Sequence, residues 1–343
     1  MGAAPSWVGT ATARAGVAGN PSDALGGAAL AVPVPALTAT VTLRDADTIT
    51  VRDAAGARGP TSVSELVRRT GRLGHDGAER LVTATIVTLH RWLVDQDRAP
   101  DDAPFEVEWS TDIPRSVGLA GSSALVIATL RALCARWDVE LTAEVTAQLA
   151  LRAEVDELGI AAGWMDRAVQ ALGAPTLVDR RVDPDTEIPR MEVVEPGGPI
   201  ELVVAWDPRG ASPSGRLHGS LRARLDAGEP EVVRCVDELV STARRAAAAL
   251  RGASIDDLAG AVDQSCALRD RLGALDDGTR VLVDAARGTG GVATSAGSGG
   301  AVLIVPWHRD ATDIRAELAA HDVPAVAVTL GLPGLPADRP QLP

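Results

Sequence analysis

Apolar positions in the first part of the chain follow two different periods. From Thr10 to Arg52, short β-rich runs separated by Gly and Pro predict several short antiparallel strands. From Val63 to Val94 the apolar residues recur at helical spacing, and from Phe105 to Trp109 they alternate as in a half-buried strand. A glycine-rich turn follows, and it opens a long apolar helix expected at Ser122 to Trp137.

The rest of the chain alternates helical and strand patterns around a polar, Pro-rich stretch. Asp179 to Pro199 reads as an interruption between units, so we place a domain boundary there, with one domain at residues 1–195 and another at 196–343. Four prolines from Pro333 on predict a loose tail. The other expected elements are helices at Thr142–Leu158, Gly163–Leu172, Val232–Leu250 and Ser254–Leu272, and strands at Ile200–Trp206, Ala301–Val305 and Ala325–Val328.

The composition indicates a folded protein that acts on small molecules. Its 343 residues are 46% hydrophobic and 23% charged, as in ordinary globular proteins. A net charge of −13 disfavours nucleic acid and anionic membranes as partners. Leu25 to Leu43 is uncharged, but its Gly and Pro residues favour buried strands over a membrane span. Three widely spaced cysteines indicate neither a disulfide framework nor a zinc site, and no secretory pattern is present, so we expect a cytoplasmic protein.

The first candidate site is the glycine-rich turn before the Ser122–Trp137 helix. Gly118 and Gly121 would let the backbone approach an anion, and a helix start offers unpaired N–H groups. The pattern predicts a phosphate cradle, to which Ser122 or Ser123 would add a hydroxyl ligand for phosphate-bound Mg²⁺. The alternative is a serine that caps a core helix. A Walker motif is excluded because the chain contains no lysine.

A second glycine-rich run, Gly288 to Gly300, leads directly into an apolar strand. So many glycines before a core strand predict that the backbone closely approaches a ligand or another loop. A purely structural turn is the alternative.

Carboxylates between the two glycine-rich runs are candidates for metal binding or proton transfer. Glu154, Asp156 and Glu157 lie on a predicted helix, and Asp166 follows a glycine-containing bend. Phosphoryl transfer needs such groups to hold Mg²⁺ and to accept or orient a hydroxyl proton. A solvated helix face is the alternative, and it applies most to Asp156 and Glu157.

The turn after the first predicted strand gathers short polar side chains. Asn20, Ser22 and Asp23 could hydrogen-bond a polyol, and Arg14 precedes them. An Asx-turn, in which these side chains bond only to the local backbone, is the alternative.

These regions, in this order, resemble the GHMP kinase superfamily, which includes galactokinase, homoserine kinase and mevalonate kinase. Gly118–Ala124 is similar to its phosphate loop, with one residue more before the paired serines than is usual, and Thr294–Gly300 is similar to its C-terminal glycine motif. Within the superfamily the chain is most similar to plant-type glucuronokinases, over about residues 12 to 306. The segments that carry this likeness are Gly19–Asp23, Ile113–Arg115, Glu157–Arg167, Pro213–His218 and Ser298–Val302.

The resemblance implies a two-domain α+β fold of the GHMP kinase type, with an N-terminal half like domain 2 of ribosomal protein S5 and a C-terminal ferredoxin-like α/β sandwich. It implies that Asp166 is the catalytic base or orients the accepting hydroxyl, with Arg14 beside it. Glu154 would bind Mg²⁺ together with Ser123, and Glu157 is a weaker candidate. The implied ATP-binding residues are Pro114, Gly118, Leu119, Ala120, Gly121, Ser122, Ser123, Ala124, Gly297, Ser298 and Gly299. The implied substrate-binding residues are Asn20, Ser22, Asp23, Arg115 and Arg216.

The resulting hypothesis is an ATP- and Mg²⁺-dependent sugar 1-kinase that acts on D-glucuronate. Without lysine, the partner of the substrate carboxylate should be an arginine, and Arg115, Arg209 and Arg216 remain open. Alternatives are a superfamily kinase for another sugar, an amino acid or a mevalonate-like alcohol, and a non-catalytic paralogue that binds sugar or nucleotide. A dinucleotide-dependent oxidoreductase is the weakest of the alternative functions, because its glycine fingerprint is missing from the sequence.

Overall fold

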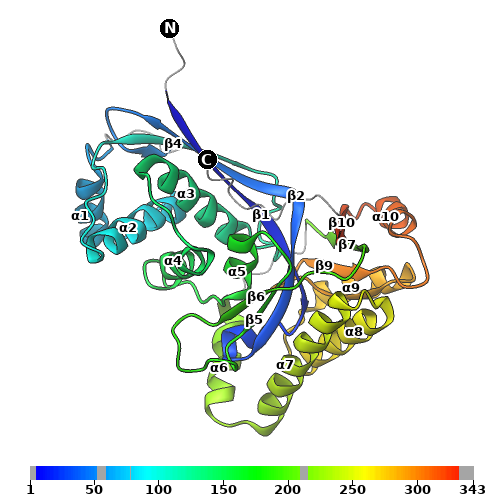
Figure 1. The fold of residues 1–343 in the computed structure, drawn as a ribbon. Helices are drawn as coiled ribbons and strands as arrows, with labels where there is room; N and C mark the ends of the chain where they lie inside the picture. Colours follow the sequence, from blue (N-terminus) through cyan, green and yellow to red (C-terminus); the bar gives the residue numbers. More distant parts are fainter. Residues whose placement is uncertain (1–4, 52–58, 78, 209–214, 332–343) are drawn as a thin grey trace.

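The computed structural model of the chain describes residues 5–51, 59–77, 79–208 and 215–331. Within these residues the strands form two sheets and the fold is α+β (Figure 1). The elements up to residue 193 are β1 (Ser6–Ala18), the 3₁₀ helix η1 (Ser22–Leu25), β2 (Ala28–Asp45), β3 (Thr50–Val51), α1 (Val63–Leu73), α2 (Arg80–Asp95), β4 (Phe105–Thr111), α3 (Gly121–Trp137), α4 (Ala143–Val155), α5 (Met165–Leu172), β5 (Thr176–Asp179) and β6 (Arg190–Val193). The elements after residue 199 are β7 (Ile200–Trp206), α6 (Gly215–Asp226), α7 (Pro230–Arg251), α8 (Ile255–Arg271), α9 (Asp277–Gly288), β8 (Val292–Ser295), β9 (Ala301–Val305), α10 (Ala311–Ala320) and β10 (Ala325–Leu330).

The first sheet is built around two long strands, which corrects the prediction of short ones. Its order is β3-β4-β2-β5-β6, and β1 pairs with β2 in an antiparallel hairpin from Ser6↔Arg44 to Ala18↔Leu30. Register shifts after Thr12 and Gly16 let β1 bend without ending. The glycine at position 9 marks a close approach rather than a turn, because a Cβ there would lie 2.1 Å from the carbonyl oxygen of Ala128 on α3.

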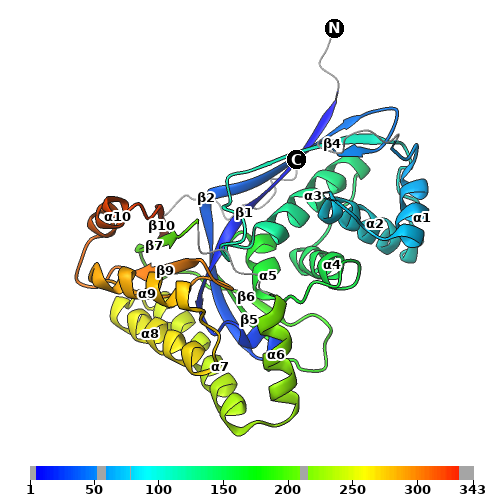
Figure 2. The same cartoon turned by 180° about the vertical axis from the view of Figure 1, so that it is seen from behind.

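Helices cover both faces of the β1–β2 hairpin. Helices α3 and α5 pack on β1 and β2 from one side, and α7 packs on the same strands from the other, as the two opposite views show (Figures 1 and 2). The helical spacing seen from Val63 to Val94 corresponds to two helices, because Gly74 ends α1 with a φ of 77°. Leu25–Leu43 lies mostly in β2, and none of the helices in the described residues is long and apolar enough to cross a membrane.

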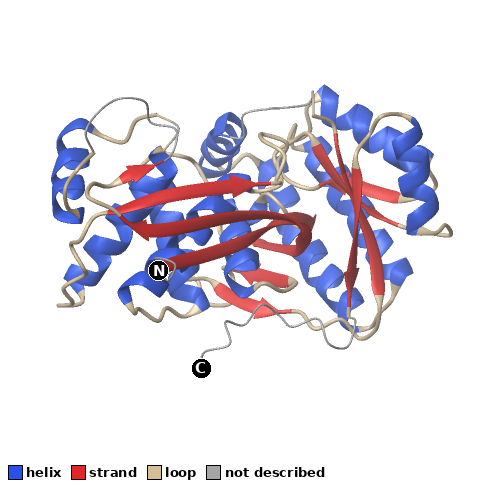
Figure 3. Cartoon of the chain, turned by 90° about the horizontal axis from the view of Figure 1, so that it is seen from above, coloured by secondary structure: helices blue, strands red, loops and turns tan. Residues whose placement is uncertain are grey.

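The second sheet has the order β10-β7-β9-β8, with every pair antiparallel, and α8, α9 and α10 pack against it. Seen from above, the strands form two separate groups, each with helices around it (Figure 3). The chain passes from one sheet to the other between Val193 and Ile200, at the end of the predicted interruption. The same interruption contains the four-residue strand β6, which had no recognisable pattern in the sequence. A continuous apolar core joins both sheets and includes Leu30, Leu202 and Val240. We retain residues 195/196 as a proposed boundary, and the predicted tail from Pro333 lies outside the described residues.

Candidate functional site

The two glycine-rich loops lie in contact at the centre of the molecule. A Cβ on Gly297 would lie 2.0 Å from the carbonyl oxygen of Gly118, and a Cβ on Gly118 would lie 2.7 Å from the carbonyl oxygen of Gly299. Gly118 also has a φ of +80°, which favours glycine. The predicted close backbone approach is confirmed, and the neighbour of each loop is the other loop.

The first loop leads into α3 without a side-chain cap. Ala120, in the left-handed conformation, precedes the helix and offers no capping oxygen, so the alternative of a serine cap is wrong. Ser123 is fully buried and donates to the carbonyl oxygen of Ala120 at 3.2 Å, whereas Ser122 is exposed and lines a cavity. The start of α3 therefore presents the positive end of a helix, and Ser122 is the serine of the pair on the cavity wall.

Arg14 on β1 connects both loops to Asp166. Its Nε donates to Oδ1 of Asp166 at 2.6 Å, and its Nη1 donates to the carbonyl oxygens of Gly118 at 2.6 Å and Ala296 at 3.1 Å. Only 4% of Arg14 is exposed. A single guanidinium group thus fixes two loops relative to one carboxylate.

Asp166, in the first turn of α5, and Glu154, near the end of α4, line one cavity with Arg167 between them. Arg167 forms an ion pair with Glu154 through Nη2, and its Nη1 lies 3.5 Å from Oδ2 of Asp166. Burial alone would lower the pKa of Arg167, but the carboxylates of Glu154 and Asp166 outweigh burial and raise that pKa. The buried guanidinium therefore stays charged and holds both carboxylates in place.

Glu154 has the chemistry of a ligand for a hard cation. It is fully buried, and its Oε1 has no hydrogen-bond partner among the described residues. In that part of the chain no group of three or more His, Cys, Asp or Glu residues could hold a metal by itself. Mg²⁺ commonly takes one or two carboxylates and completes its shell with water and substrate phosphates. The unpaired oxygen of Glu154 and the nearby hydroxyl of Ser122 fit an ion of this kind.

The turn after β1 forms another part of the cavity wall. Asn20 and Asp23 line it, and Oδ2 of Asp23 accepts from the backbone N–H of Met165 at 3.0 Å. Gly163 leaves room for this contact, because a Cβ there would lie 2.4 Å from the same oxygen. Ser22 is fully buried, and its hydroxyl bonds the backbone of Ala28 as donor and acceptor. Asn20 and Asp23 therefore face the cavity, while Ser22 holds the turn together.

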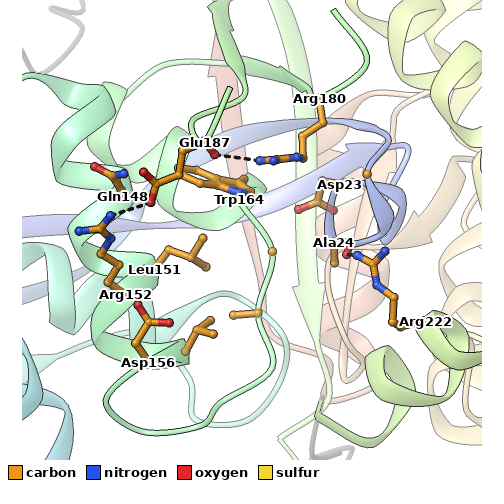
Figure 4. A pocket seen from close by; sticks show the side chains of 14 residues that line it. Asp23, Ala24, Gln148, Leu151, Arg152, Asp156, Trp164, Arg180, Glu187 and Arg222 are labelled. Atoms are coloured by element: carbon orange, nitrogen blue, oxygen red, sulfur yellow. Dashed lines mark hydrogen bonds and ion pairs between the residues drawn. The ribbon is translucent and has the colours of Figure 1, made fainter. Parts of the chain in front are cut away.

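The cavity at Asp166 has a volume of about 80 Å³ and adjoins a larger one of about 510 Å³ (Figure 4). Both are lined by Asp23, Ala24, Ala162 and Gly163, so the two cavities lie on either side of a shared wall. Ser298, from the second glycine-rich loop, lines the smaller cavity.

Several residues singled out in the sequence lie elsewhere. Glu157 pairs with Arg91 and lies 3.2 Å from Nε2 of His75, outside both cavities, and Arg115 is exposed and lines neither. Arg209 falls outside the described residues, as does the side chain of Arg216 on α6. Pro114 is partly buried beside the first loop, and Leu119 and Ala124 are buried supports of it rather than parts of the cavity wall.

Two buried arginines at the site were not predicted. Arg167 lies in a motif that was recognised, but its role was not. Arg269 on α8 donates to the carbonyl oxygens of Ser295 at 2.6 Å and Gly297 at 2.6 Å, and so supports the second loop from behind. Burial lowers the pKa of Arg269 to about 10. The signal for Arg269 was available, since it occupies the apolar face of its helix, spaced by helical turns from Val262 and Cys266.

Comparisons with known proteins identify relatives of this chain. The profile of the GHMP kinases N terminal domain matches residues 80–174, which include the first glycine-rich loop, Glu154 and Asp166. Glucuronokinase 1 of Arabidopsis thaliana is 29% identical in an alignment of 311 residues, which covers 85% of this chain and 83% of that protein.

Solved structures share the fold at low identity. Phosphomevalonate kinase of Streptococcus pneumoniae, solved with phosphomevalonate and AMPPNP, matches with a TM-score of 0.74 and 15% identity over 94% of this chain and 99% of that one. Galactokinase of Lactococcus lactis, solved with galactose, matches with a TM-score of 0.70 and 16% identity over 94% and 92%. The α+β kinase fold expected from the sequence is confirmed.

Proposed function

Because this chain belongs to the GHMP kinase superfamily and is an ATP-dependent small-molecule kinase, we propose that it phosphorylates the anomeric hydroxyl of D-glucuronate. The products are glucuronate 1-phosphate and ADP. The observation that carries the proposal is Asp166, which Arg14 holds beside both glycine-rich loops and which faces the cavity. The likeness to glucuronokinase 1 of Arabidopsis thaliana supports the choice of sugar.

The nucleotide phosphates would lie on the first loop and the start of α3. Backbone N–H groups of Gly121, Ser122 and Ser123 and the dipole of the helix stabilise negative charge there. The second loop, through Gly297, Ser298 and Gly299, lies against the first. Glu154 and Ser122 would hold Mg²⁺. Ser123 is the next residue of the helix. When bound, the ion neutralises charge on the phosphate oxygens.

The sugar would enter from the side of Asn20 and Asp23. Asp166 orients the hydroxyl on C1 and accepts its proton as the hydroxyl oxygen bonds to the γ-phosphorus. The bond from that phosphorus to the bridging oxygen breaks, and the electron pair leaves with ADP. The ion pairs with Arg14 and Arg167 fix the direction of the carboxylate, so positioning supplies much of the catalysis.

The remaining features concern partners and compartment. Cys134, Cys235 and Cys266 are free thiols, which supports a reducing, cytoplasmic location. A small molecule is the proposed partner, in keeping with the negative net charge of −13.

The proposal is tested by measuring ADP release with MgATP across D-glucuronate, D-galacturonate, D-glucose, D-galactose and mevalonate. We expect the highest kcat/KM with D-glucuronate and a product whose phosphorus is bonded to the anomeric oxygen, as phosphorus NMR can show. A higher kcat/KM for a neutral sugar or for mevalonate would leave a superfamily kinase with a different substrate. Ligand binding without ADP release from any of them would favour the non-catalytic paralogue.

A further inference from the structure

The larger cavity is the one of the two that can hold most of a substrate. Its volume of about 510 Å³ falls within the roughly 300–1,000 Å³ of typical ligand pockets, whereas the 80 Å³ at Asp166 does not. The two cavities share a wall that includes Asp23 and Gly163. A substrate whose reacting hydroxyl meets Asp166 is too large for the smaller cavity alone, and the larger cavity is the space that adjoins it.

Two arginines on the wall of the larger cavity have no carboxylate partner among the described residues. Arg222, on α6, donates through Nη2 to the carbonyl oxygen of Ala24. Arg180, which follows β5, donates to the carbonyl oxygens of Glu187 at 3.0 Å and Thr186 at 3.3 Å. A guanidinium group has five N–H donors, so each arginine retains donors after these backbone contacts.

Charged side chains of both signs line the cavity. Arg222 lies beside the turn that carries Asp23 and Ala24, Arg180 lies near the same turn, and Asp156, which directly follows α4, lies across the cavity (Figure 4). The third arginine of the wall, Arg152, is neutralised by Glu187 at 2.6 Å. A negatively charged group is therefore attracted to Arg180 and Arg222 and repelled by Asp23 and Asp156.

We propose that Arg222, assisted by Arg180, binds the carboxylate of an acidic sugar and thereby selects a uronate over a neutral sugar. This inference rests on the proposed kinase function and deepens it. In a pyranuronate, C1 with the reacting hydroxyl and C5 with the carboxylate are both bonded to the ring oxygen, so the two groups lie at the same edge of the ring. One sugar can thus present its hydroxyl to Asp166 and its carboxylate to the adjoining wall.

Arg222 also differs from the arginines named from sequence. Arg115 is exposed away from both cavities, and the side chains of Arg209 and Arg216 are outside the described residues. The contact with Ala24 places Arg222 directly beside Asp23, the residue that both cavities share.

The test compares D-glucuronate with D-glucuronamide, which has nearly the same shape and no charge. In Arg222→Met we expect KM for D-glucuronate to rise about 10-fold or more, as for the loss of a charge-assisted hydrogen bond. Arg180→Met should give a smaller rise. Activity on D-glucuronamide should change by less than about 3-fold in both variants, because the amide makes no ion pair. Arg222→Lys should recover part of the loss, since it restores charge without the planar fork.

Arg181→Met is the matched control, because Arg181 pairs with Asp237 on the surface at 2.7 Å and lines neither cavity. It should leave both substrates unaffected, and thermal unfolding should show that all variants are folded. Equal losses on uronate and uronamide in Arg222→Met would mean that Arg222 only holds α6 to the turn, and would overturn the inference. A wild-type enzyme that uses D-glucuronate, with variants that use it equally well, overturns the arginine assignment alone. A wild-type enzyme that phosphorylates neutral sugars and no uronate overturns both the assignment and the proposed substrate.

Discussion

Arg14 and Asp166 are 152 positions apart in the chain, yet Nε of Arg14 lies 2.6 Å from Oδ1 of Asp166. The long strand β1 and the short helix α5 bring them together, and the same arginine also binds the carbonyl oxygen of Gly118. The position of the candidate base therefore depends on the position of the first glycine-rich loop. Changes at either place should affect both the nucleotide and the acceptor.

Asp166→Asn should replace the charged carboxylate by a neutral amide of nearly the same size. We expect kcat to fall about 10²-fold or more and KM for ATP to stay within about 3-fold, because the orienting charge is lost while the loops keep their arginine contacts. Steady-state kinetics with D-glucuronate, together with thermal unfolding, would measure this. Asp237→Asn, which changes an exposed carboxylate paired with Arg181, is the control and should have no effect on kcat. Turnover of Asp166→Asn within a few-fold of wild type would reject the role of Asp166.

Gly297→Ala should disturb the contact between the two loops. Its Cβ would lie 2.0 Å from the carbonyl oxygen of Gly118 and 3.0 Å from Nη1 of Arg14, and backbone cannot move aside cheaply. We expect a loss of about 1–3 kcal/mol in the free energy of unfolding and a KM for ATP raised about 10-fold. Urea denaturation and initial rates would measure both.

Gly260→Ala is a control that should raise the stability of the protein instead of lowering it. Gly260 is exposed on α8, and a Cβ there would meet no atom within 4 Å. Alanine should therefore stabilise the helix by up to about 1 kcal/mol and leave KM unchanged. If Gly297→Ala and Gly260→Ala changed the free energy of unfolding and KM for ATP alike, the close contact at Gly297 would not explain the effect of Gly297→Ala.

The three thiols should be unreactive in the folded protein. Burial raises the pKa of Cys134 to about 12 and also raises the pKa values of Cys235 and Cys266. At pH 8 the thiolate fraction of Cys134 should then be about a thousandfold smaller than that of an exposed thiol near 9. A thiol reagent should detect three cysteines only after unfolding in urea. Rapid modification of the native protein at pH 8 would contradict this.

The raised pKa values of the thiols determine whether the stability of the protein rises or falls with pH. A thiol whose pKa is higher in the folded state stays protonated there, while the unfolded thiol ionises above about 9. The unfolded state then binds fewer protons, so stability should fall as the pH rises above about 9. Urea denaturation at pH 7, 9 and 10 would check this direction.

Long periodic segments made the larger elements predictable from sequence. The helix expected at Ser122–Trp137 is α3 at Gly121–Trp137, because it is a long apolar run that is buried on nearly all sides. The one expected at Val232–Leu250 is α7 at Pro230–Arg251, because it buries a regular apolar stripe. Short strands such as β5 and β8 have four residues and no period of their own. They form because neighbouring strands, β2 for β5 and β9 for β8, offer unpaired edges, which is a tertiary effect.

The site was predictable where backbone chemistry requires glycine or where a carboxylate follows a recognisable bend. Gly118, Gly297, Glu154 and Asp166 meet as expected around one cavity or its supporting loops. The contacts of Arg167 and Arg222 were not predictable, because an arginine in a sequence gives no sign of which carboxylate or carbonyl it will meet. Their partners come from elements that only the tertiary fold brings near.

Glu154→Gln should separate the metal role of Glu154 from that of Glu157. The change removes the charge that pairs with the buried Arg167, so we expect a loss of about 3 kcal/mol or more in the free energy of unfolding. It also removes the charged oxygen offered to the cation, so the Mg²⁺ concentration for half-maximal activity at fixed ATP should rise about 10-fold. Glu157→Gln breaks a pair with the half-exposed Arg91 and should cost about 1 kcal/mol or less, with an unchanged Mg²⁺ dependence. Titrations of Mg²⁺ against ADP release, beside urea denaturation, measure both quantities. A shift in the Mg²⁺ titration with Glu157→Gln and none with Glu154→Gln would assign the cation to Glu157 and leave Glu154 as only the buried partner of Arg167.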